Sequence, residues 1–208
     1  MRGRCCLYIV LSLAVLLILG IFVLTRILDG GATGMPRQAE VPADIPAYDR
    51  SDWGDWIDAD NNCRNTRHEV LAEESVEPVT FRSPRQCRVA SGRWIGPYTG
   101  QTYIDPGSLD VDHVVPLANA HRSGAWAWDS DRKRDYYNDR SNPGHLIAVE
   151  RAVNREKGSQ GPEHWKPSNQ AHWCDYARNW ISVKDKWDLT ATADEIAALQ
   201  AMLETCTN

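Results

Sequence analysis

The stretch DVDHVVPLANAH, Asp110–His121, decides how this sequence folds and where its chemistry lies. Side chains of a strand alternate between two faces, so Val111 points to one face while Asp110 and Asp112 point to the other. His113 stands near the end of the strand, and the proline that follows ends backbone pairing. A bulge or turn there would bring Asp112 and His113 into one cleft. An Asp-His pair alone is more often a surface ion pair, so its surroundings must decide.

A second stretch, NPGHLIAVERAVNREKG (Asn142–Gly158), supplies a partner for that strand. Its Asn-Pro-Gly opening is a turn signal, and the apolar run at 145–149 predicts a short strand. Residues 150–157 predict a short helix that stops at the final glycine. Asn154 and Lys157 are three residues apart and therefore neighbours on that helix. The order strand, long loop, turn, strand, helix predicts an α+β fold.

The chain begins with an apolar run, Leu7–Leu24, that is long enough to span a bilayer as a helix. We favour an uncleaved anchor (residues 1–26) over a secretory signal, whose apolar core is shorter. Arginines ahead of the run predict a cytoplasmic N-terminus and an extracytoplasmic remainder. The Gly- and Pro-containing segment 27–47 predicts a linker, which leaves 48–208 as one globular domain. The predicted protein is attached to the cell membrane by a single span, or secreted if that span is cleaved.

Four cysteines lie in the predicted outer domain, and an even number in an exported domain indicates two disulfides. They are Cys63, Cys87, Cys174 and Cys206. Residues 168–187 and 192–206 both have helical patterns, and the short link between them makes the two helices antiparallel. That arrangement places Cys174 beside Cys206 and leaves Cys63 to pair with Cys87.

The rival to the second disulfide is a zinc site built from His164, His172 and Cys174. Structural zinc sites usually contain closely spaced pairs of cysteines, and no CxxC pair supports this one. We therefore favour the two disulfides.

The charge balance argues against a protein whose whole surface binds nucleic acid. The chain has 23 Lys and Arg against 28 Asp and Glu, a formal net charge of −5. Three of the basic residues lie at or before Arg26, so the remainder carries a net charge near −8. Non-specific nucleic-acid binders are usually basic. Any contact with nucleic acid must therefore use a local patch, with a metal ion offsetting charge.

The two quoted stretches together resemble the HNH, or ββα-metal, nucleases. DVDHVVP followed by HLIAVERAVNREKG is similar in spelling and order to the nuclease domain of RNA-guided DNA nucleases. The similarity is closer to small exported HNH proteins related to the C-terminal domain of GmrSD-type restriction enzymes. Those proteins share four cysteines, a segment like CRNTRHEVL and a hairpin like GPYTGQTY. The resemblance implies a ββα-metal core extended by helices, a β-hairpin and two disulfides.

Position by position, the resemblance implies roles for the matching residues. His113 corresponds to the general base, while Asp112 and Asn154 correspond to metal ligands. His145 stands where the family usually has asparagine, and we expect it to brace the loop that holds His113. The alternatives for His145 are a contact to the metal or to a phosphate, and Asp110 is expected to be structural. Candidates for holding substrate phosphates are Arg155, Lys157 and Arg67, with a salt bridge as the alternative role for Arg67.

These residue types suit the hydrolysis of a phosphodiester. A neutral imidazole has an ordinary pKa of about 6.5 and accepts a proton from water near neutral pH. A divalent ion stabilises the charge that develops on phosphate oxygens. Carboxylate and amide oxygens with few protein ligands suit Mg²⁺ or Mn²⁺. Zn²⁺ or Ni²⁺ becomes an alternative if His145 is a ligand.

The sequence therefore predicts a metal-dependent endonuclease that hydrolyses DNA, with RNA as an alternative substrate. Little sequence preference is expected, because no separate recognition module is visible. We expect a monomer that uses no nucleotide cofactor. The competing hypotheses are a non-catalytic DNA-binding protein of the same fold and a surface protein stabilised by zinc or disulfides.

Overall fold

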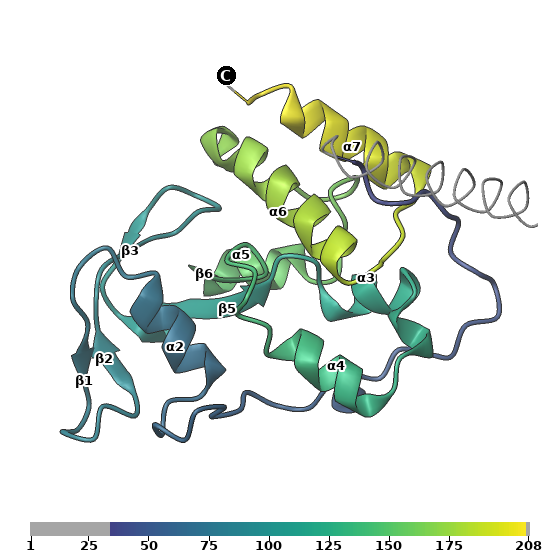
Figure 1. Ribbon diagram of the computed structural model, residues 1–208. Coiled ribbons are helices and arrows are strands. Elements are labelled where there is room, and N and C mark those ends of the chain that lie inside the picture. The colour runs from purple at the N-terminus through teal and green to yellow at the C-terminus, as the bar shows by residue number, and fades with distance from the viewer. Residues whose placement is uncertain (1–33, 207–208) are drawn as a thin grey trace, which may run out of the picture. The chain divides into compact units, whose positions relative to one another are not determined.

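The computed structural model describes residues 34–206, so the predicted anchor at Leu7–Leu24 lies outside the described residues. Within the described part, no helix is long and apolar enough to cross a membrane. From Pro36 on, the described residues form one compact unit, in which helices lie around one central two-stranded sheet while another such sheet lies at the edge (Figure 1). The architecture is therefore α+β, as the sequence predicted.

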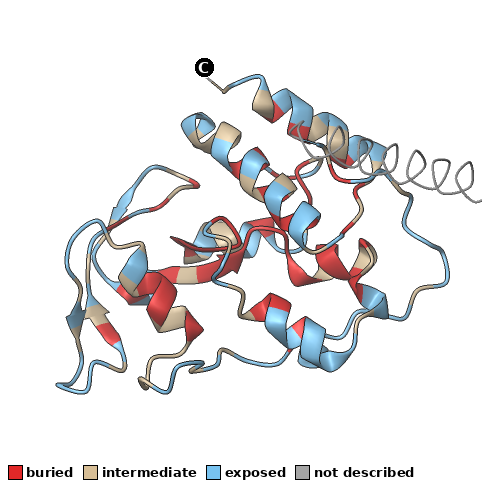
Figure 2. Ribbon diagram, viewed as in Figure 1, coloured by how far each residue is buried: buried red, intermediate tan, exposed pale blue. Residues whose placement is uncertain are grey.

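An antiparallel pair of strands followed directly by a helix forms the centre of this unit. Strands β5 (Leu109–His113) and β6 (Leu146–Glu150) pair along their full length, and helix α5 (Arg151–Lys157) begins at the next residue. The register runs unshifted to the pair His113↔Leu146, so the strand has no bulge at its end. Every residue of β6 is buried (Figure 2). Gly158 has a φ of 54°, a value that glycine adopts readily, and ends α5 as predicted.

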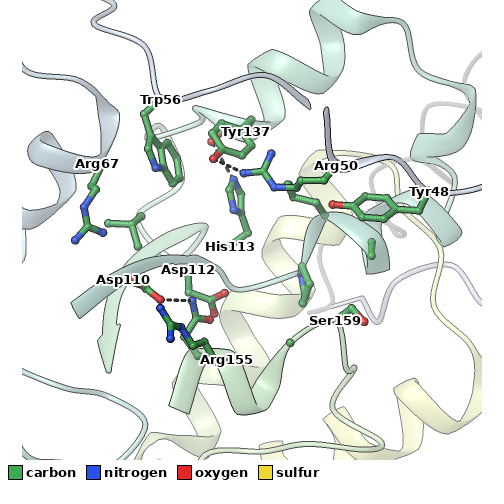
Figure 3. Close-up of a pocket in the computed structure, with 16 residues that line it drawn as sticks. Tyr48, Arg50, Trp56, Arg67, Asp110, Asp112, His113, Tyr137, Arg155 and Ser159 are labelled. Atoms are coloured by element: carbon green, nitrogen blue, oxygen red, sulfur yellow. Dashed lines mark hydrogen bonds between the residues drawn. The ribbon is translucent and has the colours of Figure 1, made fainter. Parts of the chain in front are cut away.

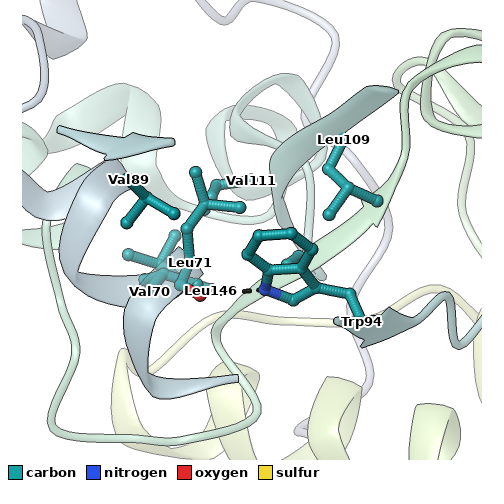
Figure 4. Packing of buried hydrophobic residues seen from close by; sticks show 8 residues of the cluster. Val70, Leu71, Val89, Trp94, Leu109, Val111 and Leu146 are labelled. Carbon is teal, nitrogen blue, oxygen red and sulfur yellow. Dashed lines mark hydrogen bonds between the residues drawn. The ribbon is translucent and has the colours of Figure 1, made fainter. Parts of the chain in front are cut away.

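The apolar face of β5 packs on a core beneath helix α2 (Thr66–Glu73) (Figure 4). The buried members of this cluster are Val70, Leu71, Val89, Trp94, Leu109, Val111, Leu146 and Ala148. The indole Nε1 of Trp94 donates a 2.8 Å hydrogen bond to the carbonyl of Leu71, so the largest ring of the cluster is also fixed in orientation. Because this face is apolar, the carboxylates of β5 point to the opposite face, toward α5.

Short hairpins precede the central pair. Strands β1 (Thr80–Phe81) and β2 (Val89–Ser91) pair with each other, as do β3 (Trp94–Ile95) and β4 (Thr102–Tyr103). A 3₁₀ turn, η2 (Pro106–Ser108), then leads into β5. The β3–β4 loop is clamped to the end of β6, because Glu150 accepts hydrogen bonds from the backbone N–H (2.8 Å) and the hydroxyl (2.5 Å) of Thr99.

Helices α3 (Leu117–Arg122) and α4 (Ser130–Tyr137) fill the long loop between β5 and β6, separated by the turn η3 (Ala125–Ala127). The end of α4 is joined to a distant part of the chain through Asn138. Its side-chain oxygen accepts hydrogen bonds from the backbone N–H of Ile57 (3.1 Å) and from the hydroxyl of Thr66 (2.7 Å). Turn η1 (Arg50–Trp53) also packs on α4.

The C-terminal helices form the predicted antiparallel pair, α6 (Trp173–Lys186) and α7 (Ala193–Leu203), after the turn η4 (Gln170–His172). Both predicted disulfides, Cys63–Cys87 and Cys174–Cys206, are confirmed. The alternative zinc site is wrong, because the sulfur of Cys174 is bonded to another sulfur and cannot act as a thiolate ligand.

Residues 36–47 fall within the segment that the sequence assigned to a linker, yet backbone hydrogen bonds hold this part to the domain. Ala39 N–H donates to the carbonyl of Ala191 at 2.9 Å, and Ala191 N–H donates to the carbonyl of Arg37 at 3.0 Å. A ring nitrogen of His121 lies 2.8 Å from the carbonyl oxygen of Pro46. Such main-chain contacts require no apolar periodicity, and so the residue pattern did not reveal them.

Candidate active site

A hollow of about 480 Å³ lies beside β5, between the start of α3 and the helix α5 (Figure 3). It brings together most of the residues that the sequence singled out. Those in its lining are Arg67, Asp110, Asp112, His113, Asn154 and Arg155. The other two, His145 and Lys157, are fully buried behind the lining.

His113 is held in one orientation at the wall of this hollow. Its Nε2 lies 3.0 Å from the carbonyl oxygen of Tyr137. Since a carbonyl only accepts hydrogen bonds, Nε2 must carry the proton, and the lone pair of the neutral ring is on Nδ1. The indole of Trp56 stacks nearly parallel to the ring at 5.4 Å between centroids. Burial is the main reason that the pKa of His113 lies well below its ordinary value, so the ring stays neutral at neutral pH.

His145 lies behind His113 and holds the same piece of backbone. Its Nε2 is 2.8 Å from the carbonyl oxygen of Tyr136, the residue just before the partner of His113. The two imidazoles meet edge to face, with centroids 5.6 Å apart. Burial lowers the pKa of His145 to about 4, so this ring too is neutral. The two histidines therefore bond to successive carbonyls at the end of α4.

Asp112 is fixed by two donors that reach it from different parts of the chain. Lys157 Nζ forms an ion pair with Asp112 Oδ2, and the hydroxyl of Tyr98 donates to the same oxygen at 2.6 Å. The lysine also donates to the carbonyls of His113 and Val114, both at 3.0 Å. Burial raises the pKa of Asp112 and lowers that of Lys157, while the attraction between the two opposes both shifts. Lys157 therefore faces the strand rather than the space where a phosphate would lie.

Asp110 and Asn154 lie together on the α5 side of the hollow. The amide nitrogen of Asn154 is 3.5 Å from Oδ2 of Asp110, and Nε of Arg151 is 3.3 Å from Oδ1. Because the amide nitrogen faces Asp110, the amide oxygen of Asn154 remains available to another partner. The sequence expectation that Asp110 has a structural role is compatible with its contact to Arg151, but Asp110 also borders the hollow.

Two arginines differ in how freely their guanidinium groups can reach a ligand. Arg67 Nη2 donates to the carbonyls of Pro106 (3.2 Å) and Leu109 (2.8 Å), and burial lowers its pKa. Arg155 is exposed at the rim and borders the same space. Arg67 is therefore a fixed positive charge, whereas Arg155 is free to move toward a phosphate.

Sequence reasoning missed several residues of the wall that come from far away in the chain. Trp56 and Arg50 precede Asp110 by more than fifty residues, and Arg50 Nη2 binds the hydroxyl of Tyr137 at 2.5 Å. Tyr98 belongs to the β3–β4 loop. The tandem tyrosine at 136–137 is the one nearby signal in the sequence, since Tyr137 borders the hollow.

The donor set on this wall fits a hard divalent cation. Asp112 and Asp110 supply carboxylate oxygens and Asn154 an amide oxygen, the ligand types that Mg²⁺ and Mn²⁺ prefer when water completes the coordination. Between residues 34 and 206, no cluster of three or more His, Cys, Asp or Glu side chains is arranged as a metal cage. With their carboxylate and amide oxygens, Asp110, Asp112 and Asn154 could build a site with few protein ligands that water completes.

The fold and this wall define a disulfide-bonded α+β protein with a histidine held beside carboxylate and amide oxygens. Residues 66–202 match the family described as "GmrSD restriction endonucleases, C-terminal domain", and the chain belongs to that nuclease-related family. The resemblance to the GmrSD C-terminal domain inferred from the sequence is thus confirmed. The chain is also 42% identical over 174 residues to a protein of Arthroderma benhamiae described as an "Uncharacterized secreted protein", covering 84% of this chain and 82% of that one. No solved structure matches the chain.

Proposed function

We propose that the protein is a metal-dependent HNH-type endonuclease that hydrolyses phosphodiester bonds in DNA with little sequence preference. The observation that carries this proposal is the hydrogen bond between His113 Nε2 and the carbonyl of Tyr137. It leaves Nδ1 unprotonated at the wall of a hollow that also presents Asp112 and Asn154. A base and oxygen ligands on one wall suit the attack of water on a phosphate.

In this proposal the chain's residues divide the work. His113 Nδ1 takes a proton from the attacking water, and Trp56 and Tyr137 keep the ring in place. Asp112 and Asn154 would hold Mg²⁺ or Mn²⁺, with Zn²⁺ or Ni²⁺ as second choices. The ion would stabilise charge on the phosphate oxygens. Arg155 would contact a flanking phosphate, and the fixed charge of Arg67 would attract the substrate to the site.

His145 is proposed to brace the backbone that orients His113 rather than to bind metal. Its full burial and its bond to the carbonyl of Tyr136 support that role. The β5–β6 pair with α5 would then be the ββα-metal core that the resemblance implied. The oxygen-only donor set that results favours magnesium or manganese.

We further propose that the nuclease acts outside the cytoplasm. Two disulfides support an oxidising compartment, and the fungal relative is described as secreted. Whether residues 1–26 anchor the protein in the membrane is a separate proposal, which protease treatment of intact cells tests by releasing or degrading an exposed domain.

The test is a plasmid assay on the full chain. Supercoiled DNA should be nicked with Mg²⁺ or Mn²⁺ and left intact with EDTA. His113→Ala should lower the rate about 10²–10⁴-fold, the usual value of a positioned general base. The matched control is His164→Ala, since the side chain of His164 is 71% exposed and lies outside the hollow. Nicking that persists in EDTA, or equal losses in both variants, would contradict the proposal.

Metal titration by calorimetry separates the base from the ligands. His113→Ala should bind Mg²⁺ or Mn²⁺ about as well as the parent chain, whereas Asp112→Ala should not. Asn154→Ala should bind more weakly, with activity partly restored at high metal concentration, because water replaces a neutral ligand. The alternative function, DNA capture without cleavage, is supported if the parent retains plasmid DNA but never nicks it.

A further inference from the structure

A second hollow, of about 400 Å³, lies at the other end of α3 from the candidate active site. Leu117 and Ala118, at the start of α3, border the first hollow, and Arg122, at its end, borders the second. Arg122 Nη2 donates at 3.0 Å to the carbonyl of Ser159, which itself borders the first hollow. The two hollows are therefore joined by one short helix and one hydrogen bond.

The lining of the second hollow combines cations with aromatic rings. Arg132 places its guanidinium over the ring of Trp128, 4.8 Å from the centroid. Trp126 has 38% of its surface exposed, which is unusual among the tryptophans of this domain. Three arginines in the lining outnumber its two carboxylates, Glu40 and Asp188. This local excess of positive charge occurs in a chain whose net charge is −5.

Exposed aromatic rings beside arginines are what proteins use to bind single-stranded nucleic acid. Bases stack on the rings while the cations contact the backbone, without any need for a particular sequence. A duplex does not expose the faces of its bases, so stacking on Trp126 requires a strand that is locally unpaired. The stack of Arg132 on Trp128 holds one of the cations in a fixed position in the lining of the same hollow.

The length of α3, whose two ends border the two hollows, suits a strand that runs from one hollow to the other. Six helical residues of α3 span about 9 Å, and a strand in a duplex advances about 3.4 Å per nucleotide. A strand whose phosphate lies in the first hollow would therefore reach Arg122, at the border of the second hollow, within about three nucleotides, and Trp126 lies beyond it in η3.

We propose that the second hollow is a binding site for the single-stranded flank of a nucleic acid whose phosphate occupies the first hollow. Trp126 stacks on a base, and Arg122 and Arg132 contact the phosphates. The site rests on the proposed function in that both take nucleic acid, but it requires only binding and not cleavage. It gives the protein a preference for substrates with an unpaired stretch beside the cut.

The test measures how oligonucleotides bind to the full chain carrying His113→Ala, which is expected to slow cleavage about 10²–10⁴-fold. Fluorescence anisotropy with a labelled twelve-nucleotide single strand should show about 5- to 100-fold weaker binding after Trp126→Ala, the usual effect of one stacked base. Arg132→Gln should lower the slope of log affinity against log salt by about one, because one phosphate contact is lost. A competing dinucleotide, too short to reach Trp126, should bind all variants equally.

The matched controls are Arg85→Gln and Ile104→Ala, two exposed residues outside both hollows. They should leave binding of the long strand unchanged, and thermal melting should confirm that every variant is folded. Equal affinity of the Trp126 variant and the parent for the long strand overturns the proposal, as does an equal loss with the dinucleotide.

The plasmid assay distinguishes failure of the second binding site from failure of the proposed nuclease function. Length-dependent binding through Trp126 in a parent chain that never nicks DNA supports the second site and refutes the nuclease. Nicking by a parent chain whose strand binding ignores Trp126 and Arg132 supports the nuclease and refutes the second site.

Discussion

Two buried lysines of this protein have nearly the same surroundings, yet they lie in very different places. The side chains of Lys157 and Lys184 are both 0% exposed, and each forms an ion pair with a buried carboxylate, Asp112 and Glu195 respectively. Each ammonium also donates hydrogen bonds to two further oxygens. Removing an ammonium from water is unfavourable, and in both cases three oxygens offset that loss.

The difference lies in what surrounds the carboxylates. Asp112 borders the hollow that holds His113, whereas Glu195 binds the indole Nε1 of Trp180 at 2.5 Å between α6 and α7. One pair therefore adjoins a space for a ligand, and the other closes a helix contact. A buried ion pair with shifted pKa values is thus no proof of a functional site, because structural pairs have the same electrostatics.

The largest expected effect is a loss of stability, and it should be equally large for the two pairs. Lys157→Met and Lys184→Met should each lower the free energy of unfolding by about 3–5 kcal/mol, since each leaves a buried carboxylate without its partner. Urea unfolding followed by tryptophan fluorescence measures this. The exposed Lys166→Met serves as control, and a loss as small as the control's in either variant would show that its pair contributes little.

The pH dependence of stability should expose the cost of burying Lys184. Burial lowers its pKa to about 8, below the 10.5 of a free lysine. Between those values the unfolded chain binds more protons, so the free energy of unfolding should rise with pH, by about 3 kcal/mol for this group. The variant Lys184→Met/Glu195→Gln should lack that rise, which urea unfolding at a series of pH values checks. Parallel curves for parent and variant would place the lysine's folded pKa near its ordinary value.

Activity should separate the pairs once both charges are removed together. Two double variants each remove both charges of one pair, namely Asp112→Asn/Lys157→Met and Lys184→Met/Glu195→Gln. The first keeps an acceptor for the hydroxyl of Tyr98 and the second keeps one for the indole of Trp180, so both should fold. The first should lose plasmid nicking by about 100-fold or more, because Asp112 is proposed to hold the metal and even residues behind metal ligands typically matter about 10- to 100-fold. The second should nick at nearly the parent rate. Equal activity of the two would mean that Asp112 has only a structural role.

The smallest effect is expected at the histidine behind the site. His145→Asn should reduce nicking by at most about fivefold, the equivalent of one neutral hydrogen bond, because an amide can still donate to the carbonyl of Tyr136. The plasmid assay beside His113→Ala is the measurement. A loss as large as that of His113→Ala would show that His145 contacts the metal or the substrate.

Much of the architecture followed from local pattern. The alternation around Val111 predicted β5, and the turn before β6 and the glycine after α5 predicted β6 and α5 to within one residue. The helical periods on either side of a short link predicted the pairing of Cys174 with Cys206. These features depend on neighbours in the sequence, which is why the sequence alone was sufficient.

The environment of the site was harder to predict, because it depends on which groups are buried. Spacing placed Lys157 next to Asn154 on α5, but only the packing shows that the lysine turns inward to Asp112. The β3–β4 loop that supplies Tyr98 and the segment that supplies Trp56 reach the site across long stretches of chain. No periodicity encodes such contacts, so the sequence did not indicate them.

The hydrogen bond between His113 and the carbonyl at the end of α4 links the geometry of the site to the folding of distant segments. The carbonyl that orients His113 belongs to Tyr137, and the next residue, Asn138, is held by Ile57 and Thr66, which precede it by 81 and 72 residues. The ring of His113 therefore has this orientation only when distant parts of the chain are in contact. A nuclease built in this way, as we propose, would gain its activity only once those parts have folded together.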